Sequence, residues 1–424
     1  MKVLFVCGLY PKGTEAYYTS VLKHGNLANP SNVYQWGVVE GLVANNIDLE
    51  VCSFPFLPTC FSGNSKTSTR EEAIEYQNRV IGRAYSYSTF PVLKELTIMR
   101  KLRMVVRRWS ASIAKDEKGV ILIYSLYGPF LKASIARTKE NPKIMVCPIV
   151  TDLFISSLKV LRKYPLLKKI QGYFEYKMIK YGLDNAHTFV LLAKGMEKYV
   201  PRAINNHVIV EGIAGAEYPK PVSKESTTEK ILLYTGSLDM HTSVKELVDA
   251  FMLTSESNFR LVICGAGAYE KYILEKLQQD KRIIYKGPVL REEAVRLQRS
   301  ATLLINPRLS SIPDTPYSFP SKTIEYLASG TPMIGYKLVG ITEDYYSYFY
   351  IPVDESIDAL SHTISDTLNR PQTELDKRAL DAWTFITTQK TADRQIKKMI
   401  DHFKGYINEN SKKNDVPYIS KRKI

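Results

Sequence analysis

Residues 305–340, INPRLSSIPDTPYSFPSKTIEYLASGTPMIGYKLVG, decide the fold class of this 424-residue chain. An apolar run ends at Asn306, and a polar loop leads to a helical pattern that opens at Ser321. Serine is a preferred N-terminal cap, and the Ser-Gly pair at 329–330 ends the pattern. A second apolar run follows at 333–336. The stretch therefore predicts a strand, a covering helix capped by Ser321, and a further parallel strand.

The same alternation of short apolar runs and helical patterns extends over the whole chain. Strand-like runs occupy 3–7, 49–54, 120–124, 144–149, 188–192, 208–211, 231–235, 260–264, 283–286, 303–306, 333–336 and 348–352. Helical patterns occupy 33–44, 94–114, 166–181, 243–253, 269–278, 292–300, 321–329 and 357–368. Strands that alternate with helices indicate parallel sheets covered by helices. We expect an α/β fold with two doubly wound Rossmann-like domains that face a cleft.

A stretch rich in Pro, Gly, Ser and Thr separates the two series of strands, which marks a linker. The predicted N-terminal domain covers 1–212, and the linker covers 213–229. The predicted C-terminal domain covers 230–380. Residues 381–424 are expected to form a helix that packs back on the N-terminal domain, followed by a frayed tail.

Composition excludes several classes of protein. With 45% hydrophobic and 24% charged residues, the chain is globular and not disordered. No segment offers about 20 uninterrupted apolar residues, so a membrane-spanning helix is not expected. Five scattered cysteines without a CxxC pair argue against a disulfide scaffold and a cysteine zinc site. Reduced thiols favour the cytoplasm as the location.

The net charge of +15 lies almost entirely in the first half of the chain. Residues 1–205 hold 29 Lys and Arg against 15 Asp and Glu, whereas 206–424 hold 29 against 28. A one-sided basic half suggests an extended anionic partner, either nucleic acid or a membrane leaflet. Nucleic acid is disfavoured, because no RNP, zinc-finger or helix-turn-helix pattern accompanies the charge.

Two basic stretches, 94–115 and 159–180, carry apolar and aromatic residues at helical spacing. Such helices can lie in the headgroup layer of an anionic membrane. The alternative is a packed helix with a solvated basic face. The first interpretation places the protein on the inner face of the cell membrane as a peripheral protein.

Small residues follow the predicted strands of the second domain, where parallel sheets bind ligands. Glycines there let the backbone approach a ligand, and the helix starts beyond them offer N–H groups to phosphate. The alternative is that they are ordinary loop residues. The candidate nucleotide-binding residues of these turns are Gly236, Ser237, Gly265, Gly267, Gly287 and Pro288.

Three charged residues of the opening stretch form the central candidate site. Glu325, one turn inside the predicted helix, can accept hydrogen bonds from both ribose hydroxyls, and Arg308 with Lys322 can neutralise a diphosphate. Ser321 and Thr323 are further candidates at the start of that helix. The alternative is a solvated Lys322–Glu325 pair within one helix.

The phrase FPSKTIEYLASGTPMIGY resembles the donor-sugar helix of family 4 glycosyltransferases with the GT-B fold. The resemblance covers most of 229–370 and includes LYTGSLD, LVICGAGAYE and VLREEAVRLQRSATLLINPR. The first domain is similar only in outline, in MKVLFVCGLYPKG and IVTDLF. The resemblance implies transfer of a sugar from a nucleotide-sugar with retention at the anomeric carbon, without a catalytic metal or other cofactor. The sequence has no Asp-x-Asp motif that would hold Mg²⁺.

The resemblance also assigns residues and exposes two departures. Glu325 matches the second Glu of the family's E-x7-E pattern, but Tyr317 stands where the first Glu is expected. Ser237 and Thr242 stand where the family commonly has an Arg and a Lys that hold the diphosphate. We therefore expect Arg308 and Lys322 to supply that positive charge.

In the first domain, Asp152 matches a family position at the cleft and would orient the acceptor hydroxyl; the alternative is an Asp that caps a turn. The catalytic candidates are thus Asp152, Arg308 and Lys322. The family often elongates lipid-linked oligosaccharides for surface polysaccharides, which predicts a saccharide or lipid-linked saccharide acceptor. The competing hypotheses are a non-hydrolysing nucleotide-sugar 2-epimerase and a degenerate carbohydrate- or lipid-binding protein.

Overall fold

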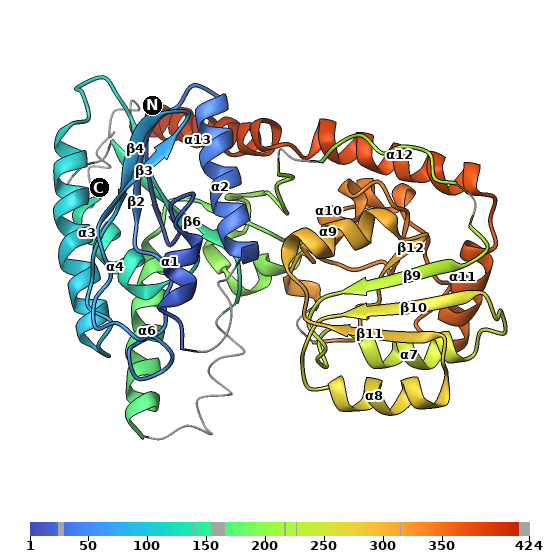
Figure 1. Cartoon of the computed structure of the whole chain (residues 1–424). Helices are drawn as coiled ribbons and strands as arrows, with labels where there is room; N and C mark the ends of the chain where they lie inside the picture. Colours follow the sequence, from blue (N-terminus) through green and yellow to red (C-terminus); the bar gives the residue numbers. More distant parts are fainter. Residues whose placement is uncertain are drawn as a thin grey trace, which may run out of the picture. The chain divides into compact units, whose positions relative to one another are not determined.

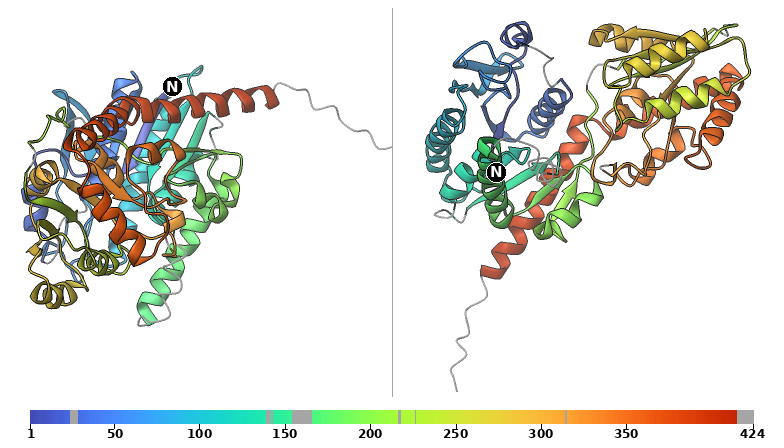
Figure 2. Two further views of the ribbon diagram at one scale, coloured as in Figure 1. Left: turned by 90° about the vertical axis from the view of Figure 1, so that its right-hand side faces the viewer. Right: turned by 90° about the horizontal axis from the view of Figure 1, so that it is seen from below.

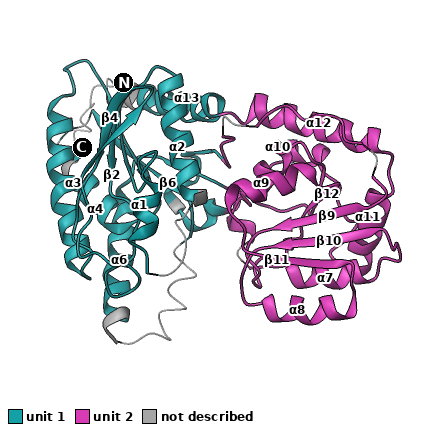
Figure 3. Ribbon diagram, viewed as in Figure 1, with its two compact units in different colours: residues 1–192, 196–210, 392–424 teal, residues 193–195, 211–391 magenta. Residues whose placement is uncertain are grey.

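The computed structural model divides the chain into two compact units, each built around its own sheet (Figures 1 and 3). Unit 1 comprises residues 1–192, 196–210 and 392–424, and unit 2 comprises 193–195 and 211–391. The described residues are 1–23, 29–138, 141, 143–153, 166–215, 218–225, 227–313 and 315–414. Both sheets are doubly wound and largely parallel, which confirms the predicted α/β class.

Unit 1 holds an eight-stranded sheet of order β3-β4-β2-β1-β5-β6-β7-β8. The strands are β1 Lys2–Cys7, β2 Asp48–Ser53, β3 Glu72–Tyr76, β4 Arg79–Ala84, β5 Gly119–Tyr124, β6 Ile144–Val150, β7 Phe189–Leu191 and β8 His207–Ile209. The helices are α1 Glu15–Ser20, α2 Asn29–Ala44, α3 Leu93–Ala111, α4 Gly128–Thr138, α6 Leu166–Asn185 and α13 Ala392–Asn414. Strands β5 and β6 are buried along their whole length, because helices cover both faces of the sheet.

The antiparallel β3–β4 pair was not expected from the sequence. Its two strands are joined by Gln77 and Asn78, which adopt φ values of 50° and 60°. Positive φ at both central residues is the geometry of a tight hairpin turn. Most of its residues are exposed or half-buried, so no apolar run announces the hairpin.

The last helix of the chain, α13, returns to complete unit 1 (Figure 2). It packs on α2, where a Cβ on Gly41 would lie 2.3 Å from the carbonyl oxygen of Ala392. Glycine at this position therefore permits the two helices to approach. The Asn45 amide also donates to the Asp393 carbonyl at 2.8 Å. Buried side chains of α13 fill the core of the unit, namely Ile396, Met399, Ile400 and Phe403. The frayed tail was predicted from Ser411, but α13 extends through Asn414, and only 415–424 lie outside the described residues.

Unit 2 holds a five-stranded parallel sheet of order β11-β10-β9-β12-β13. The strands are β9 Lys230–Thr235, β10 Phe259–Cys264, β11 Ile283–Gly287, β12 Leu303–Asn306 and β13 Met333–Gly335. The helices are α7 Val244–Met252, α8 Glu270–Gln279, α9 Arg291–Ser300, α10 Lys322–Ala328, α11 Ile357–Leu368 and α12 Gln372–Gln389. The chain builds outward from β9 to β11 and then reverses to β12 and β13, so the switch in strand order lies between β9 and β12.

The two ends of unit 2 are joined to each other. The Ala214 N–H donates to the Lys390 carbonyl at 2.8 Å. The buried Lys390 ammonium donates to Glu211 at 2.6 Å and to Asp344 at 2.7 Å. It also lies 4.4 Å from the centre of the Tyr345 ring. A buried cation with two carboxylates and an aromatic face thus fixes the segments through which the chain enters and leaves this unit.

Two local predictions in unit 2 are wrong. The run 348–352 forms no strand. The 3-10 helix η4 (Glu343–Tyr348) takes its first residue, and only Tyr350 makes a single bridge, to Ile334 in β13. Ser321 occupies the position before α10, but its side chain makes no capping hydrogen bond because its backbone is already helical. Within the described residues, no helix is long and apolar enough to cross a membrane.

Candidate active site

Glycines pack the loops that follow β9 and β10 against each other. The Gly236 N–H donates to the Cys264 carbonyl at 2.9 Å. A Cβ on Gly265, whose φ is +144°, would lie 1.7 Å from the Gly236 carbonyl oxygen, and one on Gly267 would lie 2.4 Å from that of Leu238. The contact between the two loops therefore requires glycine at positions 265 and 267, and their predicted approach to a ligand stays a prediction.

Lys322, the first residue of α10, reaches over the loop after β9. A Cβ on Gly236 would lie 2.3 Å from the Lys322 Nζ, so the missing side chain leaves the space that the ammonium occupies. The same Nζ lies 5.7 Å from the centre of the Tyr234 ring. Among the described residues, none forms a hydrogen bond or an ion pair with this ammonium.

The charges around the Lys322 ammonium favour the binding of an anion. Burial lowers the pKa of Lys322 below its usual 10.5; Glu325 and Asp239 oppose that shift, and Arg308 adds to it. Arg308 follows β12, and its Nε donates to the Thr315 hydroxyl at 2.9 Å. The structure thus brings Arg308 and Lys322 into one electrostatic field at the switch point between β9 and β12, where doubly wound sheets bind ligands.

Glu325 is half-buried, and one oxygen of its carboxylate accepts a hydrogen bond from a neighbouring helix. The side-chain amide of Gln298, on α9, donates to its Oε1 at 2.7 Å. Lys322 and Glu325, both among the described residues, form no ion pair with each other. The structure therefore differs from the alternative of a solvated pair within α10.

The remaining candidates of unit 2 differ in their exposure. Ser237, Pro288 and Ser321 are exposed at the surface. Gly287 ends β11 with a φ of +70° and has open space where a Cβ would stand. Thr323 is fully buried, and its hydroxyl has no hydrogen-bond partner among the described residues. Thr323 is therefore part of the packing beneath α10 and does not present its hydroxyl to a ligand.

Asp152, the catalytic candidate of unit 1, is exposed just after β6. The pKa of Tyr124, at the end of β5, is raised first by burial and then by the nearby negative charge of Asp152. The carboxylate thus stands at the carboxyl edge of its own sheet, the edge at which ligands bind. The other candidates belong to unit 2.

Ser237, Thr242 and Tyr317, the positions that depart from the resembled family, bring no charged side chain to the site. The Thr242 hydroxyl donates to the Ser237 carbonyl at 3.0 Å. Tyr317 ends the 3-10 helix η3 (Thr315–Tyr317) and is half-buried. Lys322 lies over Gly236 in the preceding turn and shares an electrostatic field with Arg308. That these two cations replace the missing Arg and Lys stays a prediction.

Sequence reasoning missed three neighbours of the site. Gln298 gave no signal, because a glutamine near the end of an amphipathic helix usually faces solvent. Tyr218 lies in the predicted linker, but its backbone carbonyl accepts a hydrogen bond from the indole N–H of Trp383 at 3.0 Å. Burial and then the charge of Glu325 raise the pKa of Tyr218. Asp239 lies in the loop after β9, and only the position of Lys322 reveals its role.

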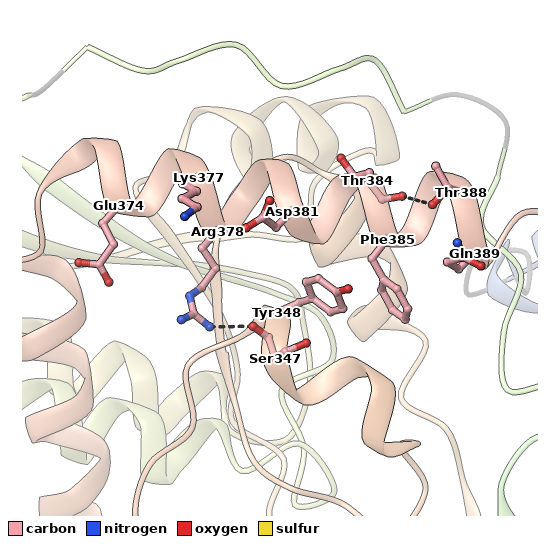
Figure 4. Close-up of a pocket in the computed structure, with 10 residues that line it drawn as sticks. All are labelled: Ser347, Tyr348, Glu374, Lys377, Arg378, Asp381, Thr384, Phe385, Thr388 and Gln389. Carbon is pink, nitrogen blue, oxygen red and sulfur yellow. Dashed lines mark hydrogen bonds between the residues drawn. The ribbon is translucent and has the colours of Figure 1, made fainter.

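A cavity of about 670 Å³ lies elsewhere on unit 2, between α12 and η4 (Figure 4). Tyr348 and Phe385 stack at its wall with ring centres 4.4 Å apart, and Arg378 donates to the Ser347 carbonyl at 2.9 Å. Its other lining groups include both Lys377 and acidic residues, so no single charge dominates. No residue predicted for the active site lines this cavity.

Over the described ranges, no group of three or more His, Cys, Asp or Glu side chains could hold a metal ion.

Residues 218–380 match the sequence family described as Glycosyl transferases group 1. Comparison with curated protein sequences gives no match. Among solved structures, the chain is similar to sucrose-phosphate synthase from Thermosynechococcus elongatus, with a TM-score of 0.62 and 15% identity over 96% of this chain and 100% of that one. The Anabaena protein HepE in complex with UDP gives a TM-score of 0.60 and 12% identity over 96% and 100% of the chains. The lipopolysaccharide outer core galactosyltransferase WaaB gives 0.54 and 13% over 97% and 100%.

These comparisons define the class of protein. The chain has the two-sheet architecture of GT-B glycosyltransferases, and its second unit contains a glycosyl transferase group 1 domain. The matched range encloses Lys322, Arg308, Glu325 and the loops around Gly236. The expected two-sheet fold is confirmed, and the glycosyl transferase group 1 domain at 218–380 supports a glycosyltransferase.

Proposed function

We propose that the protein is a retaining, metal-independent family 4 glycosyltransferase that moves a sugar, of the hexose type, from a nucleotide-sugar to a saccharide acceptor. One observation carries the proposal. The Lys322 ammonium is largely buried over Gly236, makes no hydrogen bond to a described residue, and shares its field with Arg308. A cation in that position is costly unless an anion joins it. The diphosphate of a nucleotide-sugar supplies that anion.

The other groups fit the rest of the donor. With the diphosphate against Lys322 and Arg308, the nucleoside extends toward Glu325, whose carboxylate accepts the ribose hydroxyls. The Gly236 loop lets the phosphates approach the backbone. The overall likeness to a protein bound to UDP supports a nucleoside diphosphate as the ligand of this fold.

The mechanism follows from the charges that change during transfer. When the sugar–phosphate bond breaks, negative charge grows on the diphosphate, and Arg308 and Lys322 stabilise it. The leaving phosphate takes the proton of the acceptor hydroxyl, so that no protein base is needed. Asp152 accepts a hydrogen bond from the acceptor and orients it. Because fixed side chains carry the charge, transfer is expected to proceed in the presence of EDTA.

We further propose that the acceptor is lipid-linked and that unit 1 meets the anionic inner face of the cell membrane. On α6, three exposed apolar side chains project beside basic ones: Ile170, Tyr173 and Phe174 are 46%, 54% and 62% exposed. Lys177 lies 5.3 Å from the centre of the Tyr173 ring, and Lys169 is exposed on the same helix. Aromatic rings beside lysines suit the headgroup layer.

Helix α3 offers a second basic surface. It buries Ile98, Leu102, Val105, Val106 and Trp109, while Arg100, Arg103 and Arg107 stay exposed. Its first turn adjoins α6, since Glu95 acts on the charge of Glu175. Exposed Leu93 and Leu96 extend the apolar surface there. The part of the predicted basic stretch at 159–165 lies outside the described residues.

The decisive experiment uses nucleotide-sugars themselves. A thermal-shift panel of UDP-, GDP-, ADP- and dTDP-sugars identifies the donor, because a ligand of the native state raises its melting point. Transfer of a labelled sugar to membrane extracts then tests the reaction, with and without EDTA. Absence of any binding donor would contradict the proposal. Donor converted to an epimer without acceptor would show a 2-epimerase instead.

Membrane association has its own test. Sedimentation with vesicles that contain anionic lipid should remove the protein from solution, and high salt should release it. Exchange of Phe174 for Ser together with Lys177→Glu should reduce sedimentation about tenfold, since each basic residue contributes about 1 kcal/mol. The matched control is Lys271→Glu, an exposed lysine of α8 in unit 2. Equal sedimentation of both variants would refute this placement.

A further inference from the structure

Gln298 is a buried polar residue that the mechanism above leaves without a role. Only 1% of its surface is exposed, although a glutamine in the last turns of a helix usually faces solvent. Its side-chain Nε2 donates two hydrogen bonds, one to Glu325 Oε1 at 2.7 Å and one to the Thr235 hydroxyl at 3.0 Å. The amide thus links the end of β9 to the carboxylate on α10.

The surrounding groups fix the direction of that amide. The Thr235 N–H donates to the Tyr326 hydroxyl at 3.0 Å, and this hydroxyl donates to the Thr235 carbonyl at 3.1 Å. The Gln298 backbone carbonyl accepts from the Thr331 hydroxyl at 2.7 Å. A rotated amide would place its oxygen against the Glu325 carboxylate, and two acceptors repel each other. Only the observed orientation satisfies the network.

We propose that Gln298 is a positioning residue that holds Glu325 for the ribose of the donor nucleotide and thereby sets the preference for ribonucleotides over 2′-deoxyribonucleotides. This inference rests on the proposed function. One carboxylate oxygen of Glu325 is held by Gln298, so the carboxylate keeps one orientation before the donor arrives. A free glutamate samples several rotamers, and each nucleotide would have to order it on binding.

The expected effect is on binding and not on the chemical step. Ribose contacts are made equally in the ground state and the transition state, so their loss raises KM and leaves kcat nearly unchanged. In Gln298→Met the side chain keeps its length but donates nothing. We expect the donor KM to rise about tenfold, and the affinity ratio of ribo- to 2′-deoxynucleoside diphosphate to fall from about thirtyfold to about threefold.

The experiment measures the affinity of the full chain for UDP, GDP, ADP and CDP and for their 2′-deoxy forms by calorimetry. The variants are Gln298→Met, Glu325→Gln and Gln298→Asn, which keeps the amide but cannot span the distance. The matched control is Gln372→Met, because Gln372 donates to the carboxylate of Asp376 at 2.8 Å elsewhere in unit 2. The control should keep the wild-type ratio, and Gln298→Asn should behave as Gln298→Met does.

The outcomes separate the two proposals. If no nucleoside diphosphate binds the wild-type protein, the proposed function fails and this inference fails with it. If the wild-type preference for ribose is lost in Glu325→Gln but kept in both Gln298 variants, the donor site stands and the role of Gln298 is overturned. Loss of the preference in both Gln298 variants, with unchanged kcat and melting point, supports it.

Discussion

Replacement of Lys322 by Met tests the cationic half of the donor site. Methionine keeps the length of the side chain and its contact with Tyr234 but removes the charge that lies over Gly236. A unit charge within about 4 Å of a phosphate is worth about 4 kcal/mol at the effective dielectric of a protein surface. Since negative charge grows on the phosphate during transfer, kcat/KM should fall by about 10²- to 10³-fold, with a lower kcat and a higher KM.

Steady-state kinetics at varied donor concentration measure both constants, and a melting curve verifies the fold. Lys337→Met is the matched control, because Lys337 is exposed in the same unit with its Nζ 5.6 Å from the centre of the Tyr346 ring. The control should keep wild-type kinetics. A Lys322 variant that retains both constants within about threefold would show that the diphosphate binds elsewhere, and the assignment of the site would be withdrawn.

Three further predictions follow from single contacts. Gly236→Ala places a Cβ 2.3 Å from the Lys322 Nζ, so it should displace the ammonium and lower kcat/KM about tenfold at an unchanged melting point; unaltered kinetics would contradict this geometry. Lys390→Met leaves Glu211 buried without its cation and should cost about 3–5 kcal/mol in urea unfolding, most of which the added Glu211→Gln should recover. Burial raises the pKa of Glu175 from 4.5 to about 7, so the native state holds this proton to a higher pH than the unfolded chain does. Melting curves should therefore show that unit 1 loses up to about 3 kcal/mol of stability as pH rises from 4.5 to 7. The variant Glu175→Gln should abolish that loss.

The sequence predicted those parts of the fold in which each strand is buried on both faces. Strands β5 and β6 are continuous apolar runs, and their bounds in the structure are close to the predicted ones. The β3–β4 hairpin escaped prediction because its exposed residues carry no such pattern. The run at 348–352 looks like a strand in sequence, but its apolar residues serve packing beside β13.

In the candidate site, too, some residues could be predicted from local sequence pattern and others could not. The sequence places Lys322, Arg308 and Glu325 together, because all three lie between two strands of a parallel sheet, and the structure brings their charges near one another. Their binding of a donor stays a prediction. Gln298 could not be predicted, since its importance depends on the distance to a carboxylate on another helix. The contact that requires a glycine at 265 could not be predicted either, since the neighbouring atom is the Gly236 carbonyl oxygen of another loop. Contacts between segments that are distant in the sequence depend on tertiary packing, and a local sequence pattern does not predict them.

The return of α13 to unit 1 has a consequence for biosynthesis. Synthesis on the ribosome proceeds from the N-terminus, and domains generally fold as they emerge. The strands of unit 1 emerge first, yet helix α13, which packs on α2, is translated only after all of unit 2. Unit 1 therefore keeps an apolar surface uncovered until α13 has left the ribosome. A premature stop codon just before α13 would damage the half of the protein that is made first.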